Sequence, residues 1–205
     1  DRLIPIQQGG IFLDRSSRIL LLLGPEDAYG SAVALGLGQR LAKTQPVELY
    51  CDGIPYRPAN RRFYCHRCTH WNRPPLRPVA VIQTQGAGGM EQLARWAEPL
   101  QRRPYEFYAL VHPFSPPAVT PSQTARLLRQ AEKRTGLNIT GLIHCPNSGH
   151  SVEQSLAFIR RCAAQTGKPV VLHAAASAVL QQFSKQERRE FSCLSLGETF
   201  PVATF

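Results

Sequence analysis

The chain has 205 residues, 43% of them hydrophobic and 19% charged, and its formal net charge is +10 at pH 7. Such a composition excludes a disordered chain and is sufficient for a buried core without disulfides or metal. The longest apolar run, residues 19–23, is too short to cross a bilayer, and residues 1–10 lack the pattern of a signal peptide. We therefore expect a single cytoplasmic domain over residues 1–205, with reduced cysteines and, because of its positive charge, a preference for polyanions.

Short apolar runs without alternation predict strands that are covered on both faces. They lie at residues 18–24, 47–51, 79–84, 107–112, 139–145 and 169–174. Helical patterns lie between the runs, over about 30–43, 89–100, 120–136 and 151–167. The third and fourth helices begin with the capping boxes of Thr120 and Ser151 and end at Gly136 and Gly167. This alternation predicts an α/β fold, a mostly parallel sheet with helices on both faces.

The turn after the first predicted strand has the frame of a phosphate-binding loop. Gly24 and Gly30 bracket the turn, and Ser31-Ala32 stands where such a loop has Lys followed by Ser or Thr. Glu26 and Asp27 in the turn would repel a triphosphate. Hydrolysis by the usual mechanism is therefore not expected. Two interpretations stay open, an anion held by backbone N–H groups at Gly24, Gly30 and Ser31, and a turn kept for packing.

Residues 53–78 interrupt the alternation with five prolines, six arginines and no apolar period. We predict a long insertion or ordered loop between the second and third strands. Within it, Cys65 and Cys68 have the spacing of a zinc knuckle, with His66 or His70 as a third ligand and Cys51 as the fourth. The interleaved arginines and aromatic residues also suit nucleic acid binding. The other interpretation of the aromatic residues is that they anchor the loop.

Three histidines stand at the carboxyl ends of predicted strands: His112, His144 and His173. Ligands of open parallel sheets bind outside these ends. If the strands are neighbours, the three imidazoles form a metal or acid/base site. Otherwise each satisfies a local backbone group, and the strand order decides between the two.

The order of these elements resembles the MinD/ParA-type P-loop ATPases of the SIMIBI class. The similarity is most specific over "FYALVHPFSPPAVTPSQTARLLRQAEKRTGLNITGLIHCPNSG" (107–149), and "DGIPYRPANR" (52–61) resembles the stretch after the family's second strand. The nearest branch consists of uncharacterised bacterial ATP-binding proteins. The resemblance implies a P-loop NTPase-like three-layer sandwich, commonly dimeric, and Asp52 and Gly86 match the family's nucleotide-site pattern.

Three positions depart from the family's pattern. The loop lysines are absent, Gln83 replaces the aspartate that polarises the magnesium-bound water, and His144 replaces the asparagine that contacts the base. The resemblance therefore implies a degenerate member that binds or regulates, without ATP–magnesium chemistry, and pairs with itself or with an active relative. Two alternatives remain open. One is a nucleic-acid-binding module built on residues 53–78 and held by zinc, and the other is an enzyme that uses the strand-end histidines.

Overall fold

The computed structural model describes residues 18–25, 28–51, 62–66, 79–146, 149–190 and 192–196. Within them, eight strands form one sheet in the order β3-β2-β4-β1-β5-β6-β7-β8, and every neighbouring pair is parallel. The strands are β1 (Arg18–Gly24), β2 (Val47–Tyr50), β3 (Phe63–His66), β4 (Val79–Gln85), β5 (Tyr105–Val111), β6 (Gly141–His144), β7 (Val170–Ala176) and β8 (Cys193–Leu196).

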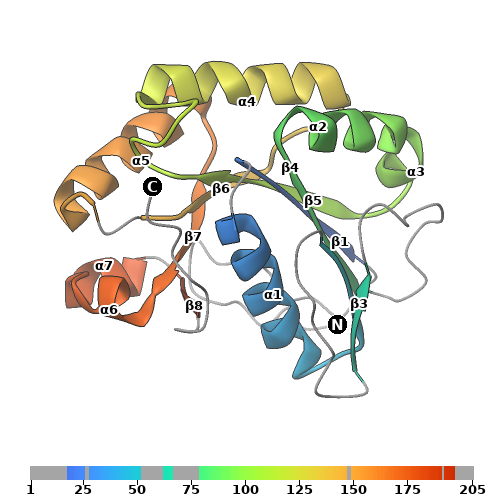
Figure 1. Cartoon of the computed structure of the whole chain (residues 1–205), viewed down its shortest axis with the longest axis horizontal. Helices are drawn as coiled ribbons and strands as arrows, with labels where there is room; N and C mark the ends of the chain where they lie inside the picture. Colours follow the sequence, from blue (N-terminus) through green and yellow to red (C-terminus); the bar gives the residue numbers. More distant parts are fainter. Residues whose placement is uncertain are drawn as a thin grey trace.

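Helices cover both faces of this sheet, which confirms the predicted α/β class (Figure 1). They are α1 (Ala28–Ala42), α2 (Gly86–Arg95), α3 (Ala97–Gln101), α4 (Pro121–Thr135), α5 (Val152–Thr166), α6 (Ser177–Gln181) and α7 (Lys185–Glu190). Helices α2, α4 and α5 lie along one side, and α1 lies on the other. No helix of the described residues is both long and apolar enough to cross a membrane.

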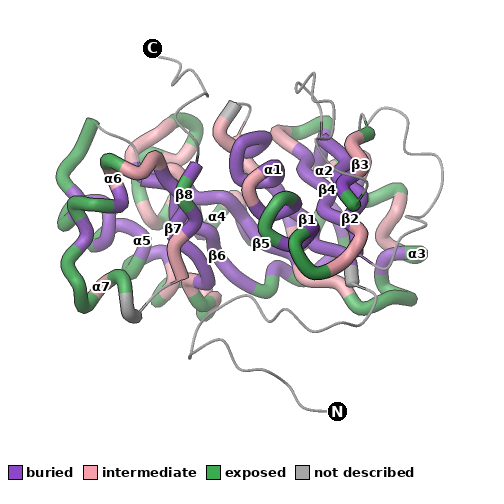
Figure 2. The backbone as a smooth tube through the Cα atoms, turned by 90° about the horizontal axis from the view of Figure 1, so that it is seen from below, coloured by how far each residue is buried: buried purple, intermediate pink, exposed green. Residues whose placement is uncertain are grey.

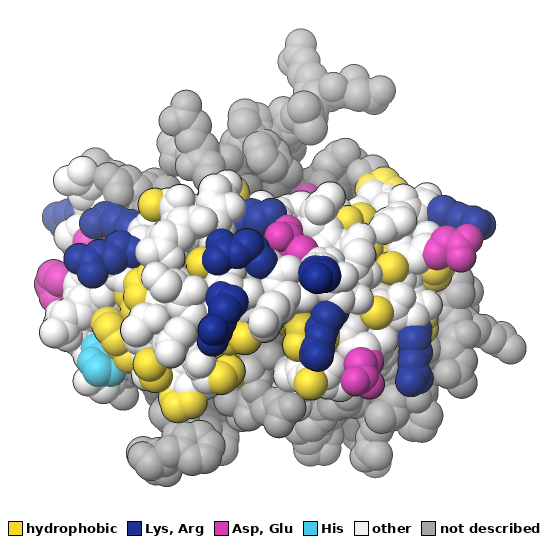
Figure 3. Space-filling model, turned by 90° about the horizontal axis from the view of Figure 1, so that it is seen from above, with side chains coloured by type: hydrophobic (Ala, Val, Ile, Leu, Met, Phe, Trp, Pro, Cys, Tyr) yellow, Lys and Arg dark blue, Asp and Glu magenta, His cyan; other side chains and the backbone are white. Residues whose placement is uncertain are grey.

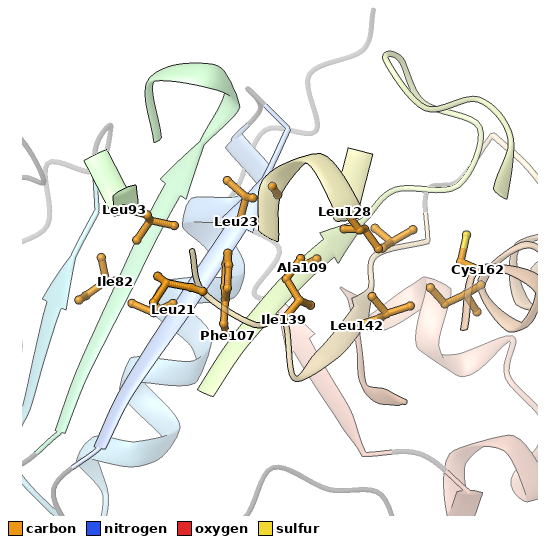
Figure 4. Close-up of a cluster of buried hydrophobic side chains, with 14 of the residues drawn as sticks. Leu21, Leu23, Ile82, Leu93, Phe107, Ala109, Leu128, Ile139, Leu142 and Cys162 are labelled. Carbon is orange, nitrogen blue, oxygen red and sulfur yellow. The ribbon is translucent and has the colours of Figure 1, made fainter. Parts of the chain in front are cut away.

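The leucine run of β1 is apolar without alternation because both faces of the strand are buried. Leu21 and Leu23 point into a core beneath α2, α4 and α5, which Figure 4 shows together with Phe107. Leu20 and Leu22 point into a second core beneath α1. Alternate side chains of a strand point to opposite faces, so a central strand needs apolar residues at every position. The buried backbone of the strands runs through the middle of Figure 2.

The predicted ends of α4 and α5 are confirmed, whereas the single helix predicted over about 89–100 is divided into α2 and α3. Thr120 and Ser151 each accept from the backbone N–H three residues on, and Gln123 and Gln154 complete the two capping boxes. Each helix ends at a glycine in the left-handed conformation, with φ 67° at Gly136 and φ 66° at Gly167.

Other boundaries differ from the prediction. The segment 53–78 contains a strand, β3, which pairs with β2 at the edge of the sheet. Helix α1 begins at Ala28, so Gly30 and Ser31 lie inside its first turn. A further strand, β8, follows α7 and was not predicted, because it has only four residues, Cys193–Leu196.

The strand order creates a switch point at β1. The connection from β1 runs to α1 on one face, whereas the connections from β4 and β5 run to α2 and α4 on the other. In open α/β sheets a crevice forms outside the carboxyl ends of the strands where the connections diverge. The start of α1 and the carboxyl ends of β4 and β5 are therefore where a ligand site is expected.

Candidate functional site

Two glycines at the switch point are packed against the protein's own side chains. A Cβ at Gly24 would lie 2.9 Å from Cδ1 of Leu110, and a Cβ at Gly30 would lie 2.9 Å from Nε2 of Gln83. Both distances are shorter than real Cβ atoms tolerate. A Cβ at either position would displace the end of Leu110 or Gln83, so this close approach favours glycine at both positions without a bound phosphate.

The carboxamide of Gln83 contacts the first turn of α1. Its Oε1 accepts hydrogen bonds from Oγ of Ser31 at 3.4 Å and from Sγ of Cys51 at 3.2 Å. All three side chains are buried, and Gln83 is only 1% exposed. A hydrogen-bonded amide in such a place avoids the cost of an unsatisfied buried polar group. The network joins α1, β2 and β4 at the carboxyl edge.

The Ser31–Gln83 contact also bears on how the turn compares with a phosphate-binding loop. Counted from Gly24, the spacing G-x-x-x-x-G-K-[ST] places Gly30 at the lysine and Ser31 at the magnesium-binding hydroxyl. In P-loop NTPases that hydroxyl and an aspartate from a neighbouring strand hold the ion. In this alignment Ser31 stands at the magnesium-binding hydroxyl, which agrees with its contact to Gln83. The predicted alignment, in which Ser31 stands in place of the lysine, agrees less well.

A magnesium ion does not fit these residues. Gln83 supplies a neutral amide where magnesium prefers a carboxylate, and its oxygen already accepts from Ser31 and Cys51. Asp52, which the resemblance implies as a site residue, lies outside the described residues, as do Glu26 and Asp27. Gly86 follows β4 with φ 59°, so its backbone conformation alone favours glycine.

The strand order brings two of the three strand-end histidines together. His144 and His173 are register partners on β6 and β7, with their Nδ1 atoms 2.6 Å apart and their rings at 84°. Nε2 of His144 lies 2.8 Å from Oγ of Ser155, in the first turn of α5. Both imidazoles are 0% exposed. His112 lies instead against α1, edge-on to the ring of Tyr29 at 4.8 Å.

Burial controls the charge of this pair. It lowers the pKa of His144 well below the ordinary value, and the positive charges of His173 and His112 lower it further. Burial also lowers the pKa of His173 to about 4, partly opposed by Glu187. Both rings are therefore neutral near pH 7.

The three histidines do not form the predicted metal site. Both nitrogens of His144 take part in hydrogen bonds, and the described part of the chain contains no group of three His, Cys, Asp or Glu placed to hold a metal. Ser155, His144 and His173 are connected like a nucleophile, a base and its orienting group. Ser155 is only 2% exposed, however, so a substrate has no access to its hydroxyl.

Ser155 was not predicted, although the sequence contains a signal for it. It lies three residues after Val152 and one before Leu156, on the buried stripe of α5. A polar residue on the apolar stripe of a helix indicates a buried partner.

Of the predicted zinc ligands, the structure describes Cys51, Cys65 and His66, whose ring is stacked on that of Tyr50. The thiol of Cys51 donates to Gln83, and burial raises the pKa of Cys65 to about 11, which disfavours the thiolate that binds zinc. Cys68 and His70 lie outside the described residues. The zinc site stays a prediction, since Cys68 and His70 are not placed.

Comparison with known proteins found no matching family model and no matching curated protein.

Proposed function

We propose that this chain is a degenerate P-loop NTPase-like protein of the MinD/ParA type, which acts as a binding or regulatory protein and does not hydrolyse nucleotide. The carboxamide of Gln83 carries the proposal. It accepts from Ser31 and Cys51 at the point where a P-loop NTPase keeps the oxygens that hold magnesium.

The chemistry of phosphoryl transfer explains why these residues argue against hydrolysis. The protein's part in that reaction is almost entirely positioning and charge stabilisation by a lysine and a magnesium ion. Gly30 has no side chain to reach a phosphate, and Gln83 brings no negative charge to a metal. A lysine at position 30 would also have to displace the Gln83 amide, which lies 2.9 Å from the required Cβ.

Two measurements on the full chain test the proposal. We expect no magnesium-dependent ATP turnover, and no magnesium-dependent heat of ATP binding by calorimetry. Ser31→Ala is the control for contamination, because turnover that survives it belongs to another protein. Turnover that depends on magnesium and is lost in Ser31→Ala would refute the proposal.

A second candidate function is binding to nucleic acid through the outer helical layer. Most exposed charges on α2, α4, α5 and the turn after α3 are positive: Arg95, Arg102, Arg103, Arg126, Arg129, Lys133, Arg134, Arg160 and Arg161. The exposed acidic residues of the described part of this layer are Glu91 on α2, Glu98 on α3 and Glu153 on α5, and Glu98 is paired with Arg102. Figure 3 shows the cations spread over this face. Arginine predominates, and its planar donors suit phosphate oxygens.

The sequence predicted a nucleic acid contact at residues 53–78, most of which lie outside the described residues. The surface proposed here is instead formed by described residues. This candidate function predicts affinity that falls steeply with salt, with a slope that drops by about 0.9 for each phosphate contact removed from duplex DNA. Arg126→Gln with Arg129→Gln, one turn apart on α4, should lower that slope. Lys43→Gln, at the end of α1 on the other side of the sheet, is the matched control. Equal slopes in all three proteins would exclude this surface.

A further inference from the structure

The pair formed by His144 and His173 joins three layers of the C-terminal half. His144 on β6 contacts α5 through Ser155, and His173 on β7 packs against the ring of Phe183 with 5.2 Å between centroids. Phe183 follows α6 and is 1% exposed. The two imidazoles thus connect the sheet both to the first turn of α5 and to the α6–α7 segment.

The contact between the two Nδ1 atoms accommodates a limited number of protons. At 2.6 Å it is a hydrogen bond that needs one proton between the rings. When the pair is neutral, either ring can be the donor. One extra proton can be held on an outer Nε2 without breaking the contact. A second extra proton would put an N–H on the Nδ1 of each ring. Two donors and two positive charges would then face each other in the protein interior.

We propose that His144 and His173 form an acid-sensitive latch that fastens α5 and the α6–α7 segment to the sheet. While the rings share one proton, the latch is closed. Uptake of two protons breaks the Nδ1–Nδ1 contact and opens this part of the chain, because charged imidazoles are stable only in contact with water. The inference is independent of nucleotide binding.

Charged and titratable groups from every neighbouring element affect the latch. They are His112 after β5, Arg160 on α5, Glu187 on α7 and Cys193 on β8. Positive charge on His112 and Arg160 opposes protonation of the pair, whereas Glu187 favours it. Burial raises the pKa of Cys193, so its thiol stays neutral over the acid range. Burial of both rings and the positive charge of Arg160 therefore keep the latch closed at neutral pH.

Amide hydrogen exchange between about pH 7.5 and 5, expressed as protection factors, tests the latch. Opening that takes up two protons reduces protection up to about a hundredfold per pH unit, against about tenfold for one proton. We expect the steep loss in β7 and α5 and a smaller one in β4. His173→Gln keeps a polar partner for His144 but takes up no proton, so its slope should be about tenfold. His150→Gln, on an exposed histidine, should keep the wild-type slope.

Equal slopes in the wild type and His173→Gln, or an equal loss of protection in β4 and β7, would overturn the latch. If His173→Gln does not fold, the imidazole nitrogens of the wild type can be followed by NMR. The latch requires both rings to stay neutral while β7 is protected. Titration of both rings near the ordinary value of free histidine, with β7 still protected, would also overturn it.

Discussion

Oγ of Ser31 lies 3.4 Å from Oε1 of Gln83, so a side chain from the end of β4 reaches the first turn of α1. This relationship explains why the carboxyl edge resembles a phosphate-binding loop in outline and differs from it in chemistry. A hydroxyl and a polar side chain meet there, but the polar side chain is neutral and its acceptor is already used. The protein's own side chains therefore satisfy one another's hydrogen bonds at this edge.

Replacing Gln83 by leucine should lower the free energy of unfolding by about 1–3 kcal/mol. The change keeps a buried side chain of similar size but leaves the donors of Ser31 and Cys51 without their acceptor. Urea unfolding measures the effect. Gln85→Leu, at the half-buried end of the same strand, is the matched control and should change stability by less than about 0.5 kcal/mol. Equal stability of Gln83→Leu and the wild type would show that the amide does not hold this edge.

Two glycines inside helices should respond oppositely to alanine. A Cβ at Gly38 on α1 would lie 2.5 Å from the ring of Phe63 on β3, and overpacking of this kind costs about 1–3 kcal/mol. Gly88 on α2 has no atom within 4 Å of the same position, so alanine there should stabilise by about 0.5–1 kcal/mol through helix propensity. Thermal unfolding of both variants measures the difference. A stabilised Gly38→Ala would contradict the close packing of α1 on β3.

Global stability should fall as the pH falls below about 6.5. The pKa of His173 is lowered to about 4 in the folded protein, so between about pH 6.5 and 4 the unfolded chain binds more protons than the folded one. Acid therefore favours unfolding, and the loss due to His173 alone is on the order of 3 kcal/mol at pH 4. Urea midpoints across this range measure it. His173→Gln should flatten the profile, and an unchanged profile in that variant would assign the acid effect to other groups.

Removal of one helix cap should weaken α4 by a known amount. Thr120→Ala deletes the hydroxyl that accepts from the backbone N–H of Gln123, and such a loss costs about 1 kcal/mol. Ser122→Ala, two residues on and exposed, keeps the cap and should be nearly neutral. Chemical denaturation of the pair distinguishes the loss of the cap from a general effect of alanine in the first turn.

The features that were predicted best from the sequence depend on residues that lie close together in the chain. The caps of α4 and α5 are encoded by Thr120 with Gln123 and by Ser151 with Gln154, each within four positions. The unalternating leucines of β1 indicated a strand covered on both faces, and the structure has helices there.

The site was harder to predict because its contacts join distant residues. His144 and His173 meet only because β6 and β7 are neighbours, with a shift in register beside Leu142. Cys51 and Gln83 meet only because β2 lies beside β4 rather than β1. Periodicity and spacing contain no information on such pairings, so the histidines were placed at strand ends without the knowledge that two of them form a pair.

The central position of β1 has a consequence for synthesis. Its neighbours are β4 and β5, so Arg18 pairs with Val79 and Ile19 with Tyr105. A ribosome makes the leucine run of β1 first and both partners much later. Until residue 109 has been made, the run lacks one full row of its backbone hydrogen bonds, and such apolar strands aggregate when their edges are open. The newly made chain should therefore need protection by chaperones until β5 has left the ribosome.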